Sequence, residues 1–392
     1  MGSLFDSSIK YEDKLKSLTS TRTLSNEIDV IESLDGLNKL RPQWDEIAFC
    51  KSVEPWQSFS WIHSAAVAYS KNKRLRIITV RKNGRLTAIA PLVLKPSEQP
   101  LKPLQFHILG GEELKEPNRL IYNDNASLDL VTDAIVSEPV YPIRLSRIPN
   151  DNGMVHLLLN KFKKHGWITR VMRMPYPYID LSGKTIKKSL KSDLRRAKKK
   201  ANKYGELGFK LISAISEKKL QPHLDTAFRI EASGWKGENN TAILSNESRR
   251  DFFERYAYAS LRDGTLRLYF LLINNEPMAV QYAIESMKAF WLLNIGYDEK
   301  FRTCSPGNLL LEASIKAASQ NGLVRYNLLG KEEPWTRRWT QTTKDCYIVS
   351  AYHCNLCGAK AMMSDALALV LKRLKDRGKT HFKIHKNIES PL

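Results

Sequence analysis

The chain has 392 residues, of which 42% are hydrophobic and 26% are charged, a composition typical of a soluble globular protein with one large or two ordinary domains. No apolar run reaches the roughly 18 residues that a membrane-spanning helix needs, which argues against an integral helical membrane protein. The formal net charge of +21 indicates an anionic partner, such as nucleic acid, a phosphorylated cofactor, an anionic glycan or a membrane face.

The N-terminal residues 1–27 are rich in Ser, Thr and Lys and predict a disordered tail. They contain no apolar core of signal-peptide length, so we expect a cytoplasmic protein, with attachment to the inner membrane face as an alternative. Five cysteines, an odd number without a secretion signal, predict reduced thiols. Cys354 and Cys357 form one CxxC pair, but zinc needs two more ligands nearby, so we predict no metal.

The first half becomes globular from residue 28 on. Apolar residues recur at helical spacing around Trp44 and Phe59. Residues 75–94 predict a β-hairpin, because two β-rich runs flank Asn83-Gly84, a strong signal for a two-residue turn. A helix over 153–165 and a strand over 167–174 complete this half.

The second half shows a similar order of elements, which predicts an internal structural duplication in a mixed α/β (α+β) chain. Asn274-Asn275 marks the turn of its hairpin. Strands are expected at 207–213, 266–273, 277–285, 289–297 and 324–330, and helices after Pro222, over 249–261 and from the Ser-Pro-Gly turn to about residue 319.

Two basic segments account for much of the net charge. Residues 181–220 hold 13 Lys and Arg against 3 Asp and Glu, and residues 360–388 hold 8 against 2. Within 184–205 the apolar residues form one helical stripe, so we expect a helix with a basic outer face that ends at Gly205. This helix, and a second one over 364–377, either bind an anionic surface such as tRNA or a membrane, or are hydrated protein surface.

The segment R-x-x-S-P-G-N joins a predicted strand to a predicted helix through Arg302, Ser305, Gly307 and Asn308. A helix N-terminus leaves backbone N–H groups without partners, and its dipole favours an anion. Glycine lets a phosphate approach the backbone closely. The segment therefore predicts either a phosphate cradle or a tight strand-to-helix connection.

This segment resembles the coenzyme A pyrophosphate signature of GNAT-fold acyltransferases, Q/R-x-x-G-x-G/A, with Ser305 in place of the first glycine. Further segments in the same order resemble the cellulose-biosynthesis (CelD/BcsL) branch of that superfamily, which is related to the Fem-like tandem-GNAT transferases. They cover roughly residues 30–350. They include PWQSFSW (55–61), LGG (109–111), SLKSDLRRAKKKANKYG (189–205), EASGWKG (231–237), EPMAVQYAI (276–284), GYDEKFRTCSPGNLLLEASIKAASQNG (296–322) and YNLLGKEEPWTRRWT (326–340).

The resemblance implies tandem GNAT-like domains, each a mixed, largely antiparallel sheet flanked by helices. It places an N-terminal scaffold half at 28–180, a C-terminal half with the acyl-donor site at 181–355, and a basic helix and tail at 356–392. The implied activity is acyl transfer, with N-acyl transfer favoured. The donor substrate would be acyl-CoA or acetyl-CoA, and the acceptor an amine or hydroxyl of a cell-envelope, polysaccharide-linked or small molecule.

The resemblance implies that the acyl group lies beside residues 292–296. Among the titratable residues predicted near that strand, Glu231 or Asp298 could act as base and Tyr282 as acid. Each has a structural alternative: a surface salt bridge with Lys236 for Glu231, a turn cap for Asp298, and a core position for Tyr282. The expected donor-binding residues are Arg302, Ser305, Gly307, Asn308 and Leu309, and the expected acceptor-binding residues are Trp235, Lys236, Asn294, Glu333 and Arg337.

The sequence departs from the branch at two points, since Trp335-Thr336 stands where relatives carry Tyr-Lys, and Asn327 where they carry Asp. Two other functions stay open. One is an aminoacyl-tRNA-dependent peptidyltransferase like the Fem group, for which the basic helix at 184–205 would suit tRNA. The other is a non-catalytic protein that binds nucleic acid or a membrane surface.

Overall fold

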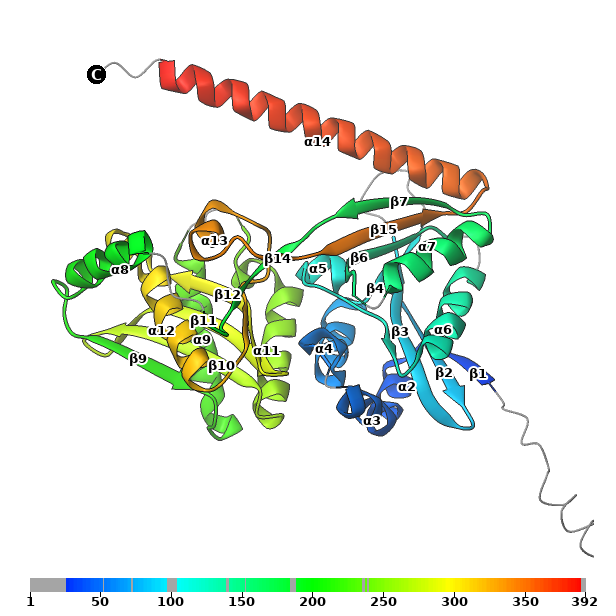
Figure 1. The fold of residues 1–392 in the computed structure, drawn as a ribbon, viewed down its shortest axis with the longest axis horizontal. Coiled ribbons are helices and arrows are strands. Elements are labelled where there is room, and N and C mark those ends of the chain that lie inside the picture. Colours follow the sequence, from blue (N-terminus) through cyan, green and yellow to red (C-terminus); the bar gives the residue numbers. More distant parts are fainter. Residues whose placement is uncertain are drawn as a thin grey trace, which may run out of the picture.

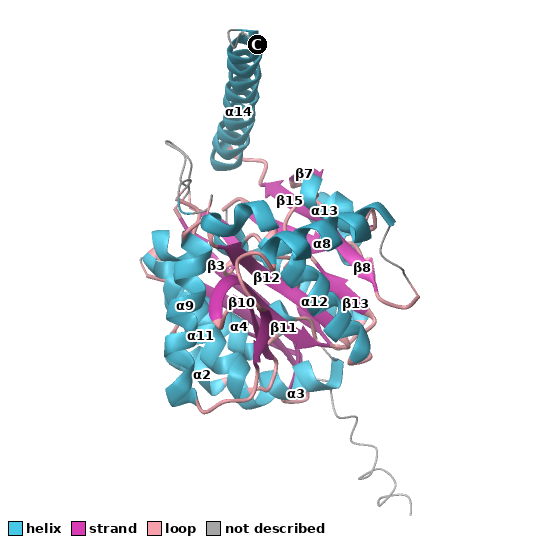
Figure 2. Ribbon diagram, turned by 90° about the vertical axis from the view of Figure 1, so that its left-hand side faces the viewer, coloured by secondary structure: helices cyan, strands magenta, loops and turns pink. Residues whose placement is uncertain are grey.

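The computed structural model describes residues 26–51, 53–71, 73–96, 104–138, 141–151, 153–183, 188–234, 237 and 240–388. It shows two α/β halves side by side (Figure 1), each built on a mixed sheet flanked by helices (Figure 2). This arrangement confirms the predicted fold class. The tail predicted at 1–27 lies outside the described residues, except for Asn26 and Glu27, which open the first strand.

The N-terminal sheet has the strand order β1-β2-β3-β4-β6-β15-β7, with β5 paired to β3. Neighbours are antiparallel except β4 and β6, which are parallel. Helices α6 and α7 cover one face, and α2, α3 and α4 pack on the other. The elements are β1 (Asn26–Ile31), α2 (Leu34–Lys39), α3 (Arg41–Lys51), η1 (Pro55–Gln57), α4 (Phe59–Tyr69), β2 (Arg74–Lys82), β3 (Arg85–Lys95), β4 (Gln105–Ile108), α5 (Gly111–Leu114), β5 (Ile121–Tyr122), α6 (Asn125–Ser137), β6 (Ile143–Pro149), α7 (Met154–Lys164), β7 (Ile168–Arg173) and β15 (Cys346–Tyr352).

The C-terminal sheet has the order β14-β8-β13-β12-β11-β10-β9, with β12 and β13 as its parallel pair. Helices α9 and α11 cover one face, and α8 and α12 the other. The elements are β8 (Tyr176–Asp180), α8 (Lys188–Ala201), β9 (Leu207–Ile212), η2 (Glu217–Lys219), α9 (Leu220–Ala232), η3 (Ile243–Ser245), α11 (Glu247–Arg262), β10 (Leu266–Ile273), β11 (Glu276–Ser286), β12 (Ala289–Tyr297), η4 (Glu299–Cys304), α12 (Pro306–Gln320), β13 (Arg325–Asn327), α13 (Pro334–Trp339) and β14 (Thr343–Lys344); α14 (Leu356–Ile388) follows β15 and projects from the body (Figure 2).

The two sheets match position by position, which confirms the tandem arrangement. In the first, β1 to β4 are antiparallel and the parallel strand β6 follows a helical crossover; in the second, β9 to β12 and β13 repeat that order. The hairpin turns agree with their sequence signals. Asn83-Gly84 and Asn274-Asn275 have positive φ at both residues, as a type I′ turn requires.

The halves exchange strands. β8 precedes the predicted boundary at residue 180 but pairs with β13 in the C-terminal sheet. β15 precedes the predicted boundary at residue 355 but pairs with β6 and β7 in the N-terminal sheet. The chain therefore crosses between the sheets after β7 and again after β14, while the division into domains at these boundaries stays a prediction.

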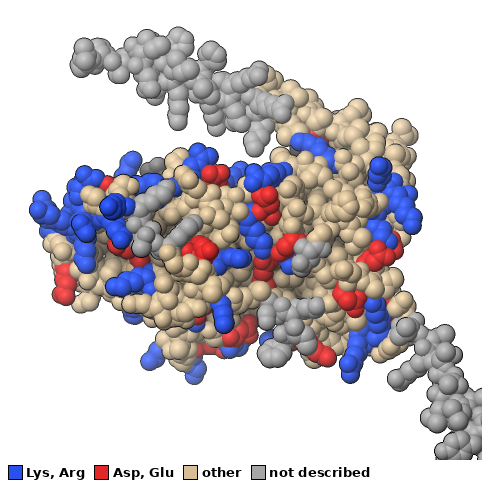
Figure 3. All heavy atoms as spheres, viewed as in Figure 1, with Lys and Arg blue, Asp and Glu red and all other residues tan. Residues whose placement is uncertain are grey.

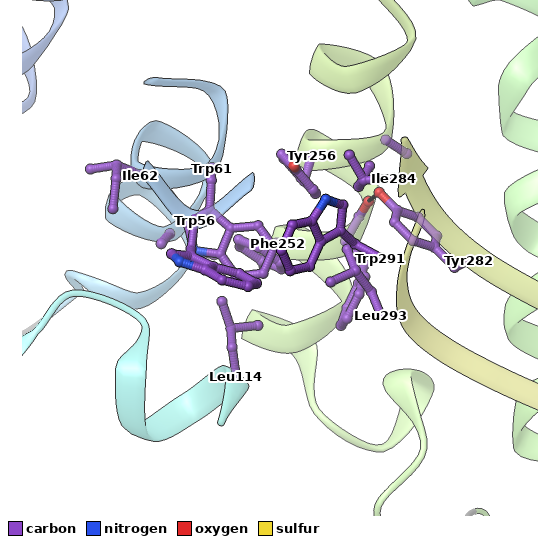
Figure 4. Packing of buried hydrophobic residues seen from close by; sticks show 14 of the residues in the cluster. Trp56, Trp61, Ile62, Leu114, Phe252, Tyr256, Tyr282, Ile284, Trp291 and Leu293 are labelled. Atoms are coloured by element: carbon purple, nitrogen blue, oxygen red, sulfur yellow. Dashed lines mark hydrogen bonds between the residues drawn. The ribbon is translucent and has the colours of Figure 1, made fainter. Parts of the chain in front are cut away.

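An aromatic core joins the halves. Trp61 on α4 packs edge-on against Phe252 and Tyr256 on α11, each with ring centroids 4.9 Å apart. Trp56 meets Trp291 of β12 in the same geometry, also at 4.9 Å. Figure 4 shows these rings interleaved between helices of the two halves. Such aromatic pairs add to the free energy gained by burying the rings, so the two halves form one packed body.

Close packing of α9 on β12 depends on Gly296. A Cβ at this position would lie 2.5 Å from Cα of Glu231, a backbone atom of α9 that cannot move aside alone. A Cβ at Gly307 would meet side chains at 3.6 and 3.8 Å, which is ordinary contact. The two glycines therefore have different structural roles.

We predict that Gly296→Ala lowers the free energy of unfolding by about 1–3 kcal/mol, because α9 must shift away from the sheet. Gly307→Ala, the matched control, should change it little. Thermal and denaturant unfolding of both variants provide the measurement. Equal stability of the two variants would contradict this account of Gly296.

Candidate active site

A cavity of about 600 Å³ lies where β12, the start of α12 and the end of α9 meet a loop of the N-terminal half. Residues 292–297 of β12 form one wall, and Gly330 and Trp335 belong to the loop and helix that follow β13. Seven residues of the predicted site line it: Glu231, Asn294, Arg302, Ser305, Gly307, Asn308 and Glu333.

The wall formed by β12 is a splayed strand. Its parallel pairing with β13 ends at Trp291 and Asn327. On the other side, Leu293 is an extra residue in the ladder with β11, because Tyr282 pairs with Asn294 and Ala283 pairs with Leu292. A bulge of this kind turns the strand and frees backbone groups on one edge. The bulge lies within the stretch 292–297 that lines the cavity.

The start of α12 has the geometry of an anion site. Ser305 adopts a left-handed conformation with φ of 50°, which explains why glycine suits this position in the signature that the sequence resembles. The N–H groups of Asn308 and Leu309 already donate to the Ser305 carbonyl oxygen, and Pro306 has none. Gly307 supplies the remaining N–H of this turn, where no intrahelical acceptor exists.

The side chains around this turn differ in their availability. Arg302 is exposed and lines the cavity, as a counter-charge for an anion requires. The Asn308 Oδ1 accepts a hydrogen bond from Trp339 Nε1 at 3.1 Å, which fixes that amide. The side chain of Leu309 points from α12 into the apolar core and does not line the cavity, so only the backbone of Leu309 belongs to the turn.

Glu231 is buried rather than on a helix surface, with 3% of its area exposed. Its Oε2 accepts from the Ile243 N–H at 2.9 Å, and its Oε1 accepts from Asn294 Nδ2 at 3.1 Å. The carboxylate therefore ties α9 to η3 and β12. It positions Asn294 at the cavity wall.

The other two candidate catalytic residues do not line the main cavity. Asp298 caps η4, and its carboxylate accepts from the Lys300 N–H at 3.0 Å. Tyr282 is buried, and its hydroxyl donates to the Phe253 carbonyl oxygen at 3.2 Å. Burial raises the pKa of Tyr282 well above its usual value, which disfavours release of its proton.

The predicted acceptor-binding residues are dispersed. Glu333 begins α13, lines the cavity and accepts from Trp335 Nε1 at 2.8 Å. Arg337 is exposed and pairs with Glu332 at 2.9 Å, away from the cavity lining. Trp235 and Lys236 lie outside the described residues.

The N-terminal half contributes a carboxylate that the sequence analysis missed. Glu116, in the loop after α5, lines the cavity, and its Oε2 is buried without a hydrogen-bond partner in the described structure. Burial raises the pKa of Glu116 to about 7, against the opposing effect of Arg147 and Arg249. A base with such a pKa is well matched to neutral pH.

Arg147 of β6 connects this loop to the C-terminal half. Its side chain is buried and donates to the Gly330 carbonyl oxygen at 2.7 Å and to the Lys115 carbonyl oxygen. No local sequence signal marks Glu116 or Arg147, because they meet the cavity only through the packing of the halves. The nearby LGG segment at 109–111, which belongs to the family resemblance, is the one sequence feature that points to this loop.

The basic helix predicted over 184–205 is α8, and residues 184–187 lie outside the described part. Leu190, Leu194, Ala197 and Ala201 are buried, and Lys and Arg gather over the outer face (Figure 3). The helix packs on η4 and α12, next to the turn that carries Arg302. The apolar face makes this contact, so the basic face points away from η4 and α12 toward solvent.

Within the described ranges, no three His, Cys, Asp or Glu side chains are grouped as metal ligands would be. Nor does the described chain contain a helix with the length and apolar character needed to cross a membrane.

A comparison with protein-family models identifies the part of the chain that contains β12 and α12. Residues 188–337 match the family model described as acetyltransferase (GNAT) domain. No curated protein sequence matches significantly.

Solved structures with this fold include the C-terminal domain of a protein described as a lysylphosphatidylglycerol synthetase from Agrobacterium fabrum (TM-score 0.52, 12% identity, covering 85% of this chain and 97% of that one). L-PGS from Bacillus licheniformis (0.52, 9%, 86% and 96%) and FemX (0.53, 13%, 78% and 95%) are similar to the same degree. At such low sequence identities, the similarity to these structures shows a shared fold alone.

The two sheets share one topology. The C-terminal sheet contributes the splayed strand β12 to a cavity that also includes the start of α12. Residues 188–337 thus match a GNAT-type acetyltransferase domain model, and the chain as a whole has a tandem GNAT-like fold similar to that of FemX.

Proposed function

We propose that this protein transfers an acyl group from acyl-CoA or acetyl-CoA to an amine or hydroxyl of an acceptor molecule, with an amine favoured. The observation that carries the proposal is one cavity that contains both the splayed part of β12 and the start of α12. In this arrangement the pyrophosphate lies on the Gly307 N–H beside Arg302, and the acyl carbonyl lies along β12.

The residues fit such a donor. The Gly307 position has room for close backbone approach, since a Cβ there would have only ordinary contacts. The dipole of the 15-residue helix α12 favours a negative charge at this end. Backbone groups freed by the bulge at Leu293 can donate to the oxyanion that develops on the acyl carbonyl.

Glu116 is the residue that we assign to proton removal. The acceptor's nitrogen or oxygen forms a bond to the acyl carbon, the carbon–sulfur bond breaks, and the acceptor's proton moves to the Glu116 carboxylate. The leaving thiolate then takes a proton from water and Glu116 releases its proton to solvent, so that the acyl-acceptor, the free thiol and the original carboxylate result. Glu231 keeps a positioning role, because both of its oxygens already accept hydrogen bonds.

A second candidate is an aminoacyl-tRNA-dependent transferase, favoured by the position of α8. The helix packs on η4 and α12 through its apolar face, and its outward basic face would attract a polyanionic donor that extends out of the cavity. Binding of this kind falls steeply with salt, whereas a pyrophosphate held in a built turn depends on salt much less.

We predict that Gly307→Val weakens binding of acetyl-CoA by at least about tenfold, because the branched side chain occupies the approach to the backbone. Calorimetric titration at low and moderate salt measures this, with Gly307→Ala as the matched control of intermediate effect. Unchanged affinity in Gly307→Val would remove the phosphate-cradle assignment. Loss of all acetyl-CoA binding at moderate salt in the wild-type protein would favour the tRNA-dependent candidate.

We predict a pH effect of Glu116 on stability that needs no substrate. A carboxyl whose pKa is raised by folding favours the folded state at low pH, and this contribution is lost as the pH rises from about 4.5 to about 7. Glu116→Gln should therefore match the wild type near pH 4 and exceed its stability at pH 8, by on the order of 2 kcal/mol. Unfolding at both pH values measures the difference.

The same variant tests the chemical role of Glu116. If the carboxylate takes the proton, Glu116→Gln should lose acyl transfer while its affinity for acetyl-CoA stays unchanged, and the wild-type rate should rise with pH up to about 7. A variant that keeps the wild-type rate and pH profile would exclude Glu116 as the base.

A further inference from the structure

A second cavity, of about 880 Å³, lies on the N-terminal half. Its floor is one face of β4, β6, β15 and β7. Gln105 and His107 of β4 and Ser350 of β15 point to this face, whereas their neighbours Phe106 and Val349 point to the opposite face and join the apolar core beneath α6 and α7. The sheet is therefore apolar on the covered face and polar on the cavity face.

The polar side chains of β4 and β15 on this face are buried, whereas Arg170 of β7 is exposed at its edge; buried polar side chains are unusual where they serve only to fill space. Gln105 is 1% exposed, and its Nε2 donates to no acceptor in the described structure. Tyr69, at the end of α4, lines the same cavity with its buried hydroxyl equally unpaired. Buried polar groups are almost always hydrogen-bonded, so these two unpaired groups point to a ligand that offers acceptor atoms.

Part of the charge in this cavity is neutralised within the protein. Glu113 accepts from Lys73 at 2.9 Å and from Lys95 at 2.8 Å. Glu112 accepts from Arg144 Nε at 3.0 Å. These pairs hold the floor and the α5 segment in place.

Three further basic residues line the cavity: Lys115, Arg170 and Arg249. None of them forms an ion pair with any residue in the described ranges. Arg249 lies over the Phe253 ring at 5.7 Å, and all three cations lack a carboxylate of the described residues within ion-pair distance. A cavity with such cations and with unpaired hydrogen-bond donors is complementary to an anion that carries many oxygens.

Arg249 also lines the main cavity, next to Glu116, so the two cavities meet at this side chain. A molecule bound in the second cavity would thus lie next to the proposed acyl site, with Arg249 between them. Because the two cavities adjoin, the N-terminal half would bind a substrate of its own in addition to forming one wall of the main cavity.

We propose that the second cavity binds the acyl acceptor through an acidic group, a carboxylate or a phosphate, on a hydroxyl-rich molecule of the acidic-sugar type. That the bound molecule is the acyl acceptor rests on the proposed function. That the cavity binds an acidic sugar does not depend on the proposed function.

The test is calorimetric titration of the full-length protein with D-glucuronate, glucose 6-phosphate and glucose. We expect saturable binding of at least one of the two acidic sugars and weaker binding of glucose by at least about tenfold. The tighter of the two acids identifies the acidic group. Equal affinity for glucose and both acids, or no binding of any of them, would overturn the proposal.

Two variants locate the site. Arg170→Gln should weaken binding of the acidic sugar about tenfold to a hundredfold. The matched control is Arg173→Gln, which removes the same charge from the same strand at a residue that pairs with Asp345 and does not line the cavity. Equal effects of the two variants would show nonspecific charge attraction and would overturn the site.

The Gln105→Leu variant distinguishes a ligand-binding role of the Gln105 amide from a structural role. If the amide serves a ligand, its replacement should lower affinity for the acidic sugar while leaving thermal stability unchanged or higher, because an unpaired buried donor is removed. A large loss of stability with unchanged affinity would assign Gln105 a structural role and contradict the proposal.

Acetyl-CoA titrated into the same variants distinguishes the two proposals. Arg170→Gln should bind acetyl-CoA normally, and Gly307→Val should bind the acidic sugar normally. Failure of acetyl-CoA binding with intact sugar binding would refute the proposed donor alone. The reverse result would refute the second cavity alone.

Discussion

The aromatic contact between α4 and α11 is the interaction on which both cavities depend. Trp61 packs edge-on against both Phe252 and Tyr256, and Trp56 meets Trp291 at the start of the splayed strand. These rings fix the distance and angle between the halves. They thereby decide that the loop after α5 reaches the wall of β12 and that Arg249 lies between the two cavities.

The exchange of strands strengthens this constraint. Because β8 completes the C-terminal sheet and β15 completes the N-terminal one, neither sheet has all of its strands without the other half of the chain. A hinge motion that opened the main cavity widely would have to bend two crossings at once. We therefore interpret the main cavity as a largely preformed site rather than one assembled on closure.

The sequence predicted those parts of the site that depend on local chemistry. The hairpin turns, the stripe of α8 and the turn at Ser305 to Asn308 all follow from residues within a few positions of one another. Glu116 could not be found in this way, because its burial and its neighbours Arg147 and Arg249 come from distant segments. The strand exchange was missed for the same reason, since β8 and β15 are short apolar runs that fit either sheet.

The backbone itself shows where the fold has been constrained around the main cavity. Lys115, Arg147, Ser305 and Leu329 all have φ between 50° and 59°, a conformation that is costly for residues with side chains. Ser305 lines the main cavity, Lys115 and Leu329 adjoin the lining residues Glu116 and Gly330, and Arg147 joins the two halves beside it. The hydrogen bond from Arg147 to the Gly330 carbonyl oxygen joins two of these strained segments across the halves. Backbone strain of this kind persists only where surrounding contacts hold it, and its concentration at the junction indicates that packing between the halves holds the site in one geometry.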